Sequence, residues 1–194
     1  MRFLVLLMTL SLVQPVMAKD INDYRTYGKE APKKMYLFTS LACPHCAQFH
    51  REILPEIQKE YLDTGKGQVV IVDMLMNRAN LMGAMLLRCA PAEKTDKIET
   101  NLYDNQRQWA YDEDQARTYL SKVALNNGIS AGEFETCMNN KELAKTVSIE
   151  QERMAKLYGV SRMPTVLVRE NEKTCSWEGA DKELVLSGLS DFFK

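Results

Sequence analysis

The chain has 194 residues, of which 45% are hydrophobic and 26% are charged, the proportions of an ordinary globular protein. These values exclude a disordered tail, a fibrous repeat and a minimal disulfide scaffold. The 25 Lys and Arg residues almost balance the 26 Asp and Glu residues, so the formal net charge is −1. Because this net charge does not attract nucleic acid or anionic lipid, we expect no nucleic-acid partner.

The first 18 residues have the pattern of a signal peptide. Arg2 supplies the positive start, residues 3–13 form an apolar run, and residues 16–18 (VMA) place small side chains where a signal peptidase cleaves. The alternative, an uncleaved membrane anchor, would need roughly 20 apolar residues. We therefore expect cleavage after Ala18 and export to the periplasm, an oxidising compartment in which thiols pair.

The first part of the mature chain predicts a β-α-β unit. Residues 35–40 (MYLFTS) predict a buried strand. From residue 43 to residue 61, apolar side chains recur about every four positions, which predicts a helix that Pro55 kinks. Residues 68–75 (QVVIVDML) form an unbroken run typical of a strand covered on both faces, as in a parallel sheet.

The middle of the chain, residues 78–158, has no strand-like run and spaces its apolar residues as helices do, in four or five segments. Pro91 separates the first two segments. Ser130 and Glu133 form a capping box that begins a later segment, and Gly159 stands where a C-cap glycine would end the last. This pattern predicts a helical insertion.

The β pattern returns after the insertion. Residues 165–169 (TVLVR) and 173–177 (KTCSW) flank a polar turn and predict a hairpin. Residues 181–193 predict a closing helix whose apolar side chains are Leu184, Leu186, Leu189 and Phe192. The order predicts an α/β, thioredoxin-like fold with an inserted all-helical subdomain. Its expected parts are a signal peptide (1–18), a first thioredoxin-like part (19–77), the insertion (78–158) and a second thioredoxin-like part (159–194).

The motif Cys43-Pro44-His45-Cys46 falls where the first predicted strand meets the first predicted helix. Both sulfurs then lie in one helical turn, where they can close a small disulfide. A purely structural disulfide is one alternative. Half of a zinc site is another, but such a site needs a second pair of ligands, and His50 is the one further histidine in the chain.

A redox site gives each residue of the motif a role. At the helix N-terminus, unpaired N–H groups favour a thiolate at Cys43, whose pKa should fall well below the free value of about 8.5. Cys46 would be the less exposed, resolving thiol. Pro44 has no N–H to lose in the first turn, and His45 adds an interaction with the Cys43 sulfur. A stabilised thiolate makes the disulfide a stronger oxidant, so this disulfide itself would serve in place of a cofactor.

A second element, Met163-Pro164-Thr165, comes directly before the late strand. We expect a cis Met163–Pro164 bond packed against the cysteine pair, which leaves the backbone of Met163 to pair with an extended substrate. A trans proline that merely begins a strand is the alternative.

With these motifs in place, the chain resembles the DsbA family of exported thiol–disulfide oxidoreductases. The resemblance covers residues 30–194 and is carried by the segments 38–49 (FTSLACPHCAQF), 61–66 (YLDTGK) and 159–165 (GVSRMPT), together with the insertion. It implies that Cys43 attacks or is attacked, that Cys46 resolves, and that His45 tunes the site. It also implies that Met163 and Pro164 bind substrate. The implied partners are unfolded exported polypeptides and a membrane quinone-linked reoxidase of the DsbB type.

One position departs from the family pattern. Thioredoxins and DsbA carry a buried acid six residues before the first cysteine, and this chain has Leu37 there. Deprotonation of Cys46 therefore needs another acceptor.

Three further cysteines remain. In an exported protein we expect a structural disulfide between Cys89 and Cys137, which closes a loop that adds about 4 kcal/mol in the chain-entropy argument. Cys175 would then be left as a small buried hydrophobe in the hairpin. We expect His50 to be a satisfied or exposed surface histidine rather than a functional one.

Two other functions stay open. The first is a disulfide reductase or isomerase on the same fold. Such isomerases carry a dimerisation module before the catalytic domain, and only about 15 mature residues precede the first predicted strand, so we expect a monomer. The second is a copper-handling protein in which Cys43 and Cys46 are ligands, helped by nearby methionines (Met74, Met76, Met82 and Met85), although core packing is the default role of those methionines.

Overall fold

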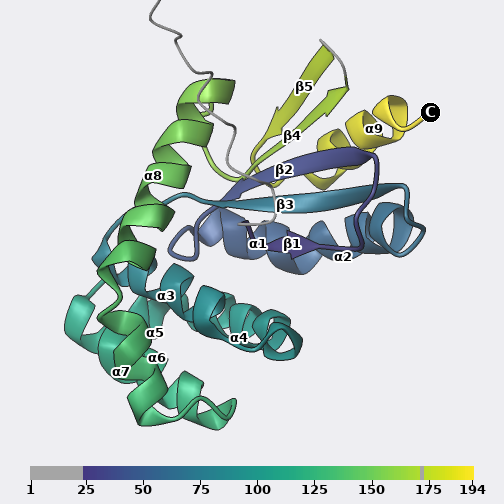
Figure 1. Cartoon of the computed structure of the whole chain (residues 1–194). Helices are drawn as coiled ribbons and strands as arrows, with labels where there is room; N and C mark the ends of the chain where they lie inside the picture. The colour runs from purple at the N-terminus through teal and green to yellow at the C-terminus, as the bar shows by residue number, and fades with distance from the viewer. Residues whose placement is uncertain (1–23, 171–172) are drawn as a thin grey trace, which may run out of the picture.

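A five-stranded mixed sheet forms the centre of the protein in the computed structural model, which describes residues 24–170 and 173–194 (Figure 1). The predicted signal peptide lies outside the described residues. The strand order is β1-β3-β2-β4-β5. The strands are β1 (Thr26–Tyr27), β2 (Lys33–Thr39), β3 (Gly67–Asp73), β4 (Thr165–Glu170) and β5 (Lys173–Glu178).

Two pairings of the sheet are the predicted ones: β2 runs parallel to β3, and β4 pairs with β5 as a hairpin. β2 also runs antiparallel to β4. Every residue of β3 is buried, as its apolar run predicts. β1, which pairs antiparallel with β3, was not predicted, because a two-residue strand carries no periodic signal and is held only by its partner.

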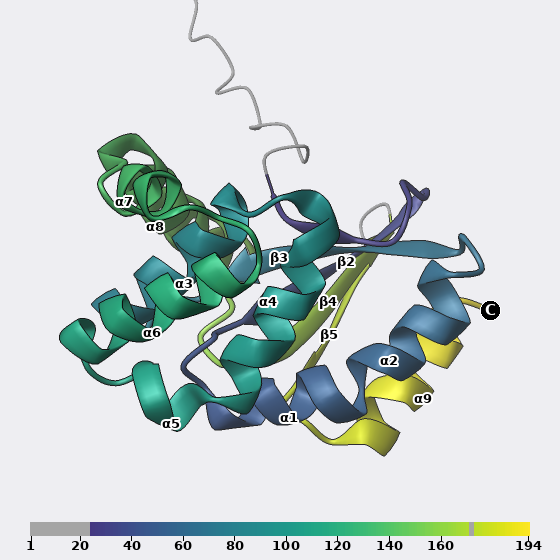
Figure 2. The same ribbon diagram turned by 90° about the horizontal axis from the view of Figure 1, so that it is seen from below.

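Helices cover both faces of the sheet. One face packs against α1 (Pro44–Glu52), α2 (Leu54–Ile57), the π-helical turn η2 (Gln58–Leu62) and α9 (Lys182–Phe192). Figure 2 shows α1, α2 and α9 on one side of the strands. The interruption between α1 and α2 falls at Ile53, two residues before the kink-forming Pro55. The opposite face packs against α8, whose Tyr158 ring lies against Tyr36 and Phe38 of β2.

The insertion contains six helices rather than four or five, among the described residues. They are α3 (Arg78–Cys89), α4 (Ala92–Asp104), α5 (Gln106–Trp109), α6 (Glu113–Asn126), α7 (Ala131–Met138) and α8 (Lys141–Tyr158). The capping box of Ser130 and Glu133 begins α7, and Gly159 ends α8 with a φ of 65°. The fully buried Trp109 lies in the core of this subdomain. Among the described residues, no helix combines the length and hydropathy that crossing a membrane requires.

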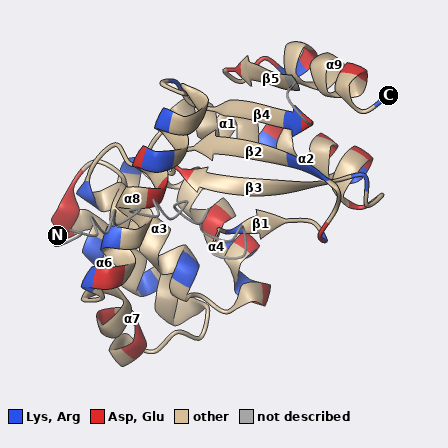
Figure 3. Ribbon diagram, turned by 45° about the horizontal axis from the view of Figure 1, so that its top comes forward, with Lys and Arg blue, Asp and Glu red and all other residues tan. Residues whose placement is uncertain are grey.

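One of the four apolar positions predicted for α9 was wrong, since Leu189 and Phe192 are buried and Leu186 packs against the core. Leu184 is 49% exposed, whereas its neighbour Val185 is fully buried. Val185 lies one helical turn before Leu189, and both face the sheet. Charged side chains of both signs are scattered over the helices of the protein (Figure 3).

Candidate active site

The cysteine motif stands at the junction of β2 and α1. Cys43 is the N-cap residue of α1, with extended backbone angles (φ −93°, ψ 122°), and Pro44 occupies the first turn. No side chain caps this helix. The free N–H groups of the first turn therefore face the Cys43 sulfur, where they stabilise negative charge.

The two thiols of the motif differ in acidity. The pKa of Cys43 is lowered from 9.0 to about 6. A hydrogen bond from the Cys46 thiol is the largest cause, the backbone N–H groups and charge of His45 add to it, and burial opposes it. The pKa of Cys46 is raised, because its hydrogen bond to Cys43, its burial and the negative charge of Cys43 all favour the protonated thiol. Cys46 is 0% exposed, and the Ser40 N–H donates to its sulfur at 3.3 Å.

The Met163–Pro164 loop lies against the first cysteine. The Met163–Pro164 peptide is cis, and the Met163 carbonyl oxygen is 3.9 Å from the Cys43 sulfur. Thr165 closes the loop, since its hydroxyl donates to the Arg162 carbonyl at 2.9 Å. The structure thus brings the cysteine motif and the predicted substrate loop together, although 120 residues separate them.

Two side chains of the insertion donate hydrogen bonds to the backbone of the active-site loop. The Gln106 side-chain amide donates to the carbonyl oxygens of Leu41 at 2.8 Å and Cys43 at 3.0 Å. The Tyr111 hydroxyl donates to the Ala42 carbonyl at 3.3 Å. Sequence analysis missed both residues, because no local pattern marks a side chain that binds a loop more than 60 residues away.

The two histidines have different surroundings. His45 is exposed, and its charge contributes to the lowered pKa of Cys43. His50 is half-buried, and its ring centroid lies 4.7 Å from that of Tyr103 on α4. Burial lowers the pKa of His50, and the nearby carboxylates of Glu99 and Asp104 act against it.

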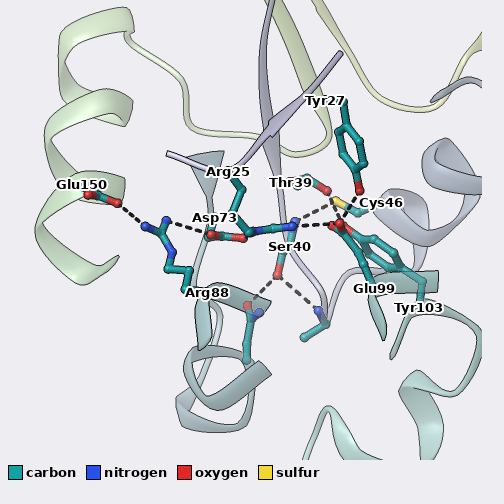
Figure 4. Close-up of polar contacts among 12 residues, drawn as sticks. Arg25, Tyr27, Thr39, Ser40, Cys46, Asp73, Arg88, Glu99, Tyr103 and Glu150 are labelled. Carbon is teal, nitrogen blue, oxygen red and sulfur yellow. Dashed lines mark hydrogen bonds and ion pairs between the residues drawn. The ribbon is translucent and has the colours of Figure 1, made fainter. Parts of the chain in front are cut away.

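Leu37 is buried on the sheet, but a buried acid does occur nearby. Glu99 on α4 is 1% exposed and begins a line of alternating charges (Figure 4), which we call the ionic ladder. Arg25 donates to Glu99 at 2.8 Å and to Asp73 at 2.7 Å. Arg88 donates to Asp73 at 3.0 Å and to Glu150 at 2.9 Å. None of these five side chains is more than 10% exposed.

The ladder meets the active site at its Glu99 end. Tyr27 donates a hydrogen bond to Glu99. The Thr39 and Tyr103 hydroxyls are hydrogen-bonded to each other at 2.8 Å. Burial is the main cause that raises the pKa of Tyr103, and the charges of Glu99 and Cys46 add to it.

The other cysteines lie away from the motif in the sequence. A disulfide joins Cys89 at the end of α3 to Cys137 on α7, with the Cα atoms 6.2 Å apart. Cys175 is a half-buried free thiol on β5, packed at the edge of the core under α9. Among the described residues, no group of three His, Cys, Asp or Glu side chains is arranged to hold a metal ion.

The four methionines considered for copper do not form one cluster. Met74 packs in the core between the sheet and α8, Met82 packs in the core of the insertion, and Met85 is buried. Met76 is 54% exposed.

The chain belongs to the thioredoxin family, whose sequence profile matches residues 22–184. Its fold is that of a DsbA-like thioredoxin domain with a helical insertion, as predicted. The crystal structure of Wolbachia pipientis alpha-DsbA1 superposes with a TM-score of 0.77 at 21% identity, over 88% of this chain and 90% of that one. BdbD from Bacillus subtilis superposes with a TM-score of 0.69 at 21% identity, over 90% and 95%.

Sequence relatives carry names from disulfide chemistry. A Rickettsia conorii chain named as a protein-disulfide oxidoreductase is 30% identical over 125 residues, which are 64% of this chain and 45% of that one. A Bacillus cereus chain named as a disulfide bond formation protein D is 24% identical over 159 residues, 77% of this chain and 72% of that one. The chain spans about half the length of the Rickettsia relatives it matches.

Proposed function

We propose that the protein is an exported thiol–disulfide oxidoreductase that donates the Cys43–Cys46 disulfide to newly translocated proteins. The opposite acidities of the two thiols carry this proposal. An acidic Cys43 at the start of α1 is a good leaving group, and a buried Cys46 of raised pKa keeps its proton once reduced. The names of the Rickettsia and Bacillus relatives support the same class of activity.

The reaction that these thiols favour has two exchange steps. A client thiolate attacks the Cys43 sulfur, the Cys43–Cys46 bond breaks, and Cys46 receives the electron pair and a proton. A second client thiolate then attacks the client sulfur of the mixed disulfide, and Cys43 leaves as a thiolate. The client gains a disulfide and the protein is left as a dithiol, so each turnover moves two electrons to the protein.

The acidity of Cys43 shifts the exchange towards disulfide donation. A pKa of about 6 in place of 9.0 stabilises the reduced protein by about 1.4 kcal/mol at pH 7, which corresponds to about 30 mV in potential. This contribution makes the disulfide more oxidising than that of an unperturbed pair. We therefore favour disulfide donation over reduction.

The proposal extends to binding and location. The backbone of the Met163–Pro164 loop, beside the Cys43 sulfur, would pair with an extended client segment, and Thr165 would hold that loop in shape. The signal-peptide pattern of residues 1–18 supports export to the periplasm, where a DsbB-type membrane partner would reoxidise the dithiol. We propose that the protein acts as a monomer.

The reduction potential of the Cys43–Cys46 pair tests the proposal. Mature protein would be equilibrated with glutathione buffers and the fraction of dithiol counted by alkylation. A potential near the roughly −120 mV of strongly oxidising members supports disulfide donation, whereas one near the roughly −270 mV of thioredoxin indicates a reductase or isomerase. In a refolding assay with a reduced client protein, the Cys43→Ser variant should lose all oxidase turnover, and retained turnover would overturn the assignment of Cys43.

The copper-handling alternative makes a different prediction. It requires tight, stoichiometric binding of Cu(I) by the reduced protein and a cysteine pair that does not react with reduced clients. Titration of Cu(I) against a chelator, run beside the refolding assay, separates the two functions.

A further inference from the structure

Cys46 exchanges a proton in every turnover, yet it has no solvent contact. Its side chain is 0% exposed, and the position from which other thioredoxin-like chains supply a buried acid is the apolar Leu37. A thiolate released at Cys46 therefore needs an internal proton donor, and a Cys46 thiol that attacks needs an internal acceptor.

Buried hydroxyl groups lead from Cys46 towards Glu99. The Thr39 hydroxyl interacts with the Cys46 sulfur and is hydrogen-bonded at 2.8 Å to the hydroxyl of Tyr103. Tyr103 lies four residues after Glu99 on α4, so both side chains project from the same face of that helix. In Figure 4 the Cys46 sulfur, the Thr39 hydroxyl and the Glu99 carboxylate gather at one end of the ionic ladder.

Glu99 is bound by fewer guanidinium groups than Asp73. Asp73 binds two guanidinium groups, those of Arg25 and Arg88, whereas Glu99 shares Arg25 with Asp73. A thiolate at Cys46 adds a second anion to the Glu99 end of the ladder, and two buried anions that share a site hold one proton between them. The charged and titratable groups that face this site are Arg25, Tyr27, Cys43, His50, Asp73, Asp96 and Asp104.

We infer that Glu99 is a positioning residue that exchanges the Cys46 proton through the hydroxyls of Tyr103 and Thr39, in place of the acid that Leu37 replaces. When a client opens the disulfide, the Cys46 thiolate takes a proton and Glu99 is left as a carboxylate. When Cys46 attacks a mixed disulfide, the proton returns. The inference rests on the proposed redox role of Cys43 and Cys46, and it assigns the helical insertion a part in that chemistry.

A single-turnover experiment tests this inference. Reduced protein is mixed with excess oxidised glutathione, so that Cys43 forms a mixed disulfide and Cys46 then resolves it with release of glutathione. Acid quenching and mass spectrometry follow the mixed disulfide at several values from about pH 5 to about pH 9. We expect Glu99→Gln to slow the resolving step by about 100-fold near neutral pH and to change its pH profile, while the first step changes less than about threefold.

Glu150→Gln is the matched control, since Glu150 is also a buried carboxylate bound to an arginine, at the opposite end of the ladder. This variant removes the same charge, and the rate of its resolving step should stay within about threefold of the wild-type rate. Equal slowing by Glu150→Gln and Glu99→Gln would overturn the inference, because the ladder would then act only through stability. A Glu99→Gln variant that resolves like the wild type at every pH would also overturn it.

Two further variants keep the test decisive. If Glu99→Gln does not fold, Tyr103→Phe removes one hydroxyl and keeps the ladder, and it should slow the resolving step in the same way. His50→Gln removes the titratable ring that packs against Tyr103, and slowing by this variant without slowing by Tyr103→Phe would overturn the inference. A wild-type protein that forms no mixed disulfide at all would contradict the proposed function itself, which distinguishes the two failures.

Discussion

Gln106 donates a 3.0 Å hydrogen bond to the carbonyl oxygen of Cys43, although 63 residues separate them in the chain. The same amide nitrogen also donates to Leu41, so one buried side chain of the insertion fixes the loop that begins α1. The geometry of the nucleophile therefore depends on the insertion as well as on the sheet.

Replacing Gln106 with Leu should loosen this loop. The substitution leaves the carbonyl oxygens of Leu41 and Cys43 without their buried donor, at a cost of about 1–3 kcal/mol for each unsatisfied group. We expect a comparable loss in the free energy of unfolding, measured with urea, and a slower reaction of Cys43 with iodoacetamide. Gln108→Leu, at an exposed position in the same helix, is the control. Unchanged stability in Gln106→Leu would show that water replaces the amide.

Removing the Cys46 thiol should make Cys43 less acidic. The hydrogen bond from Cys46 is the largest cause of the low pKa of Cys43, so in Cys46→Ala we expect that pKa to rise from about 6 towards 9.0. The pH dependence of alkylation of the reduced protein measures the change. Cys175→Ala, which removes a half-buried thiol on β5, should leave the Cys43 titration unaltered. A pKa that stays near 6 in Cys46→Ala would assign the effect to the helix N–H groups instead.

The lowered pKa also predicts how the stability of the reduced form depends on pH. The folded pKa of Cys43, about 6, lies below its ordinary value of 9.0, so the folded thiolate stabilises the reduced protein. This stabilisation is complete above about pH 9 and is lost as the pH falls through about 6. We expect the Tm of the reduced form, relative to the oxidised form, to decrease as the pH is lowered across that window. A difference in Tm that does not vary with pH would contradict the lowered pKa.

Local patterns predicted most of the fold, because the features that carry it are local. The buried run of β3, the capping box at Ser130 and the C-cap at Gly159 depend on a few adjacent residues. The cysteine motif directly follows a predicted strand and begins a predicted helix, so the sequence also placed Cys43 at the start of that helix. Leu184 of α9 was assigned to the buried face wrongly, because a run of neighbouring apolar residues fits more than one helical phase.

The contacts around the active site could not be predicted in the same way. The ionic ladder draws its five members from residue 25 to residue 150, and no spacing links them. The sequence does carry one sign of buried charge, because Asp73 ends a strand of apolar residues and Arg88 lies in an apolar helix. Charges in such places need buried partners. The identity of those partners follows only from the packing of α4 and α8 beside the sheet.

Loss of the disulfide between Cys89 and Cys137 should weaken the protein without disabling its chemistry. The bond closes a loop with a sequence separation of 48 residues, and removing it in a Cys89→Ala, Cys137→Ala double variant should cost about 4 kcal/mol in the free energy of unfolding. The refolding assay should show turnover close to that of the wild type at temperatures where the variant stays folded. If turnover disappears in a folded variant, the bond takes part in the exchange rather than in stability.

Asp73 is the centre of the ionic ladder, and Asp73→Asn should be among the most damaging single substitutions. It leaves the guanidinium groups of Arg25 and Arg88 without the carboxylate they share, and breaking a buried pair costs about 3–5 kcal/mol. We expect the free energy of unfolding, measured with urea at neutral pH, to fall by that amount. Glu135→Gln, which breaks an exposed pair with Arg117, should cost no more than about 1 kcal/mol.

The pH dependence of this loss tests its electrostatic origin. Burial opposes ionisation of Asp73, but Arg25 and Arg88 together outweigh it and lower its pKa. A lowered folded pKa gives stability that is complete above the unfolded value of about 3.9 and disappears as the pH falls through the folded value. The difference in unfolding free energy between wild type and Asp73→Asn should therefore be constant near neutral pH and shrink in strong acid. A difference that persists in acid would mean that Asp73 acts through packing, because a protonated carboxyl and an amide would otherwise leave the two arginines equally uncompensated.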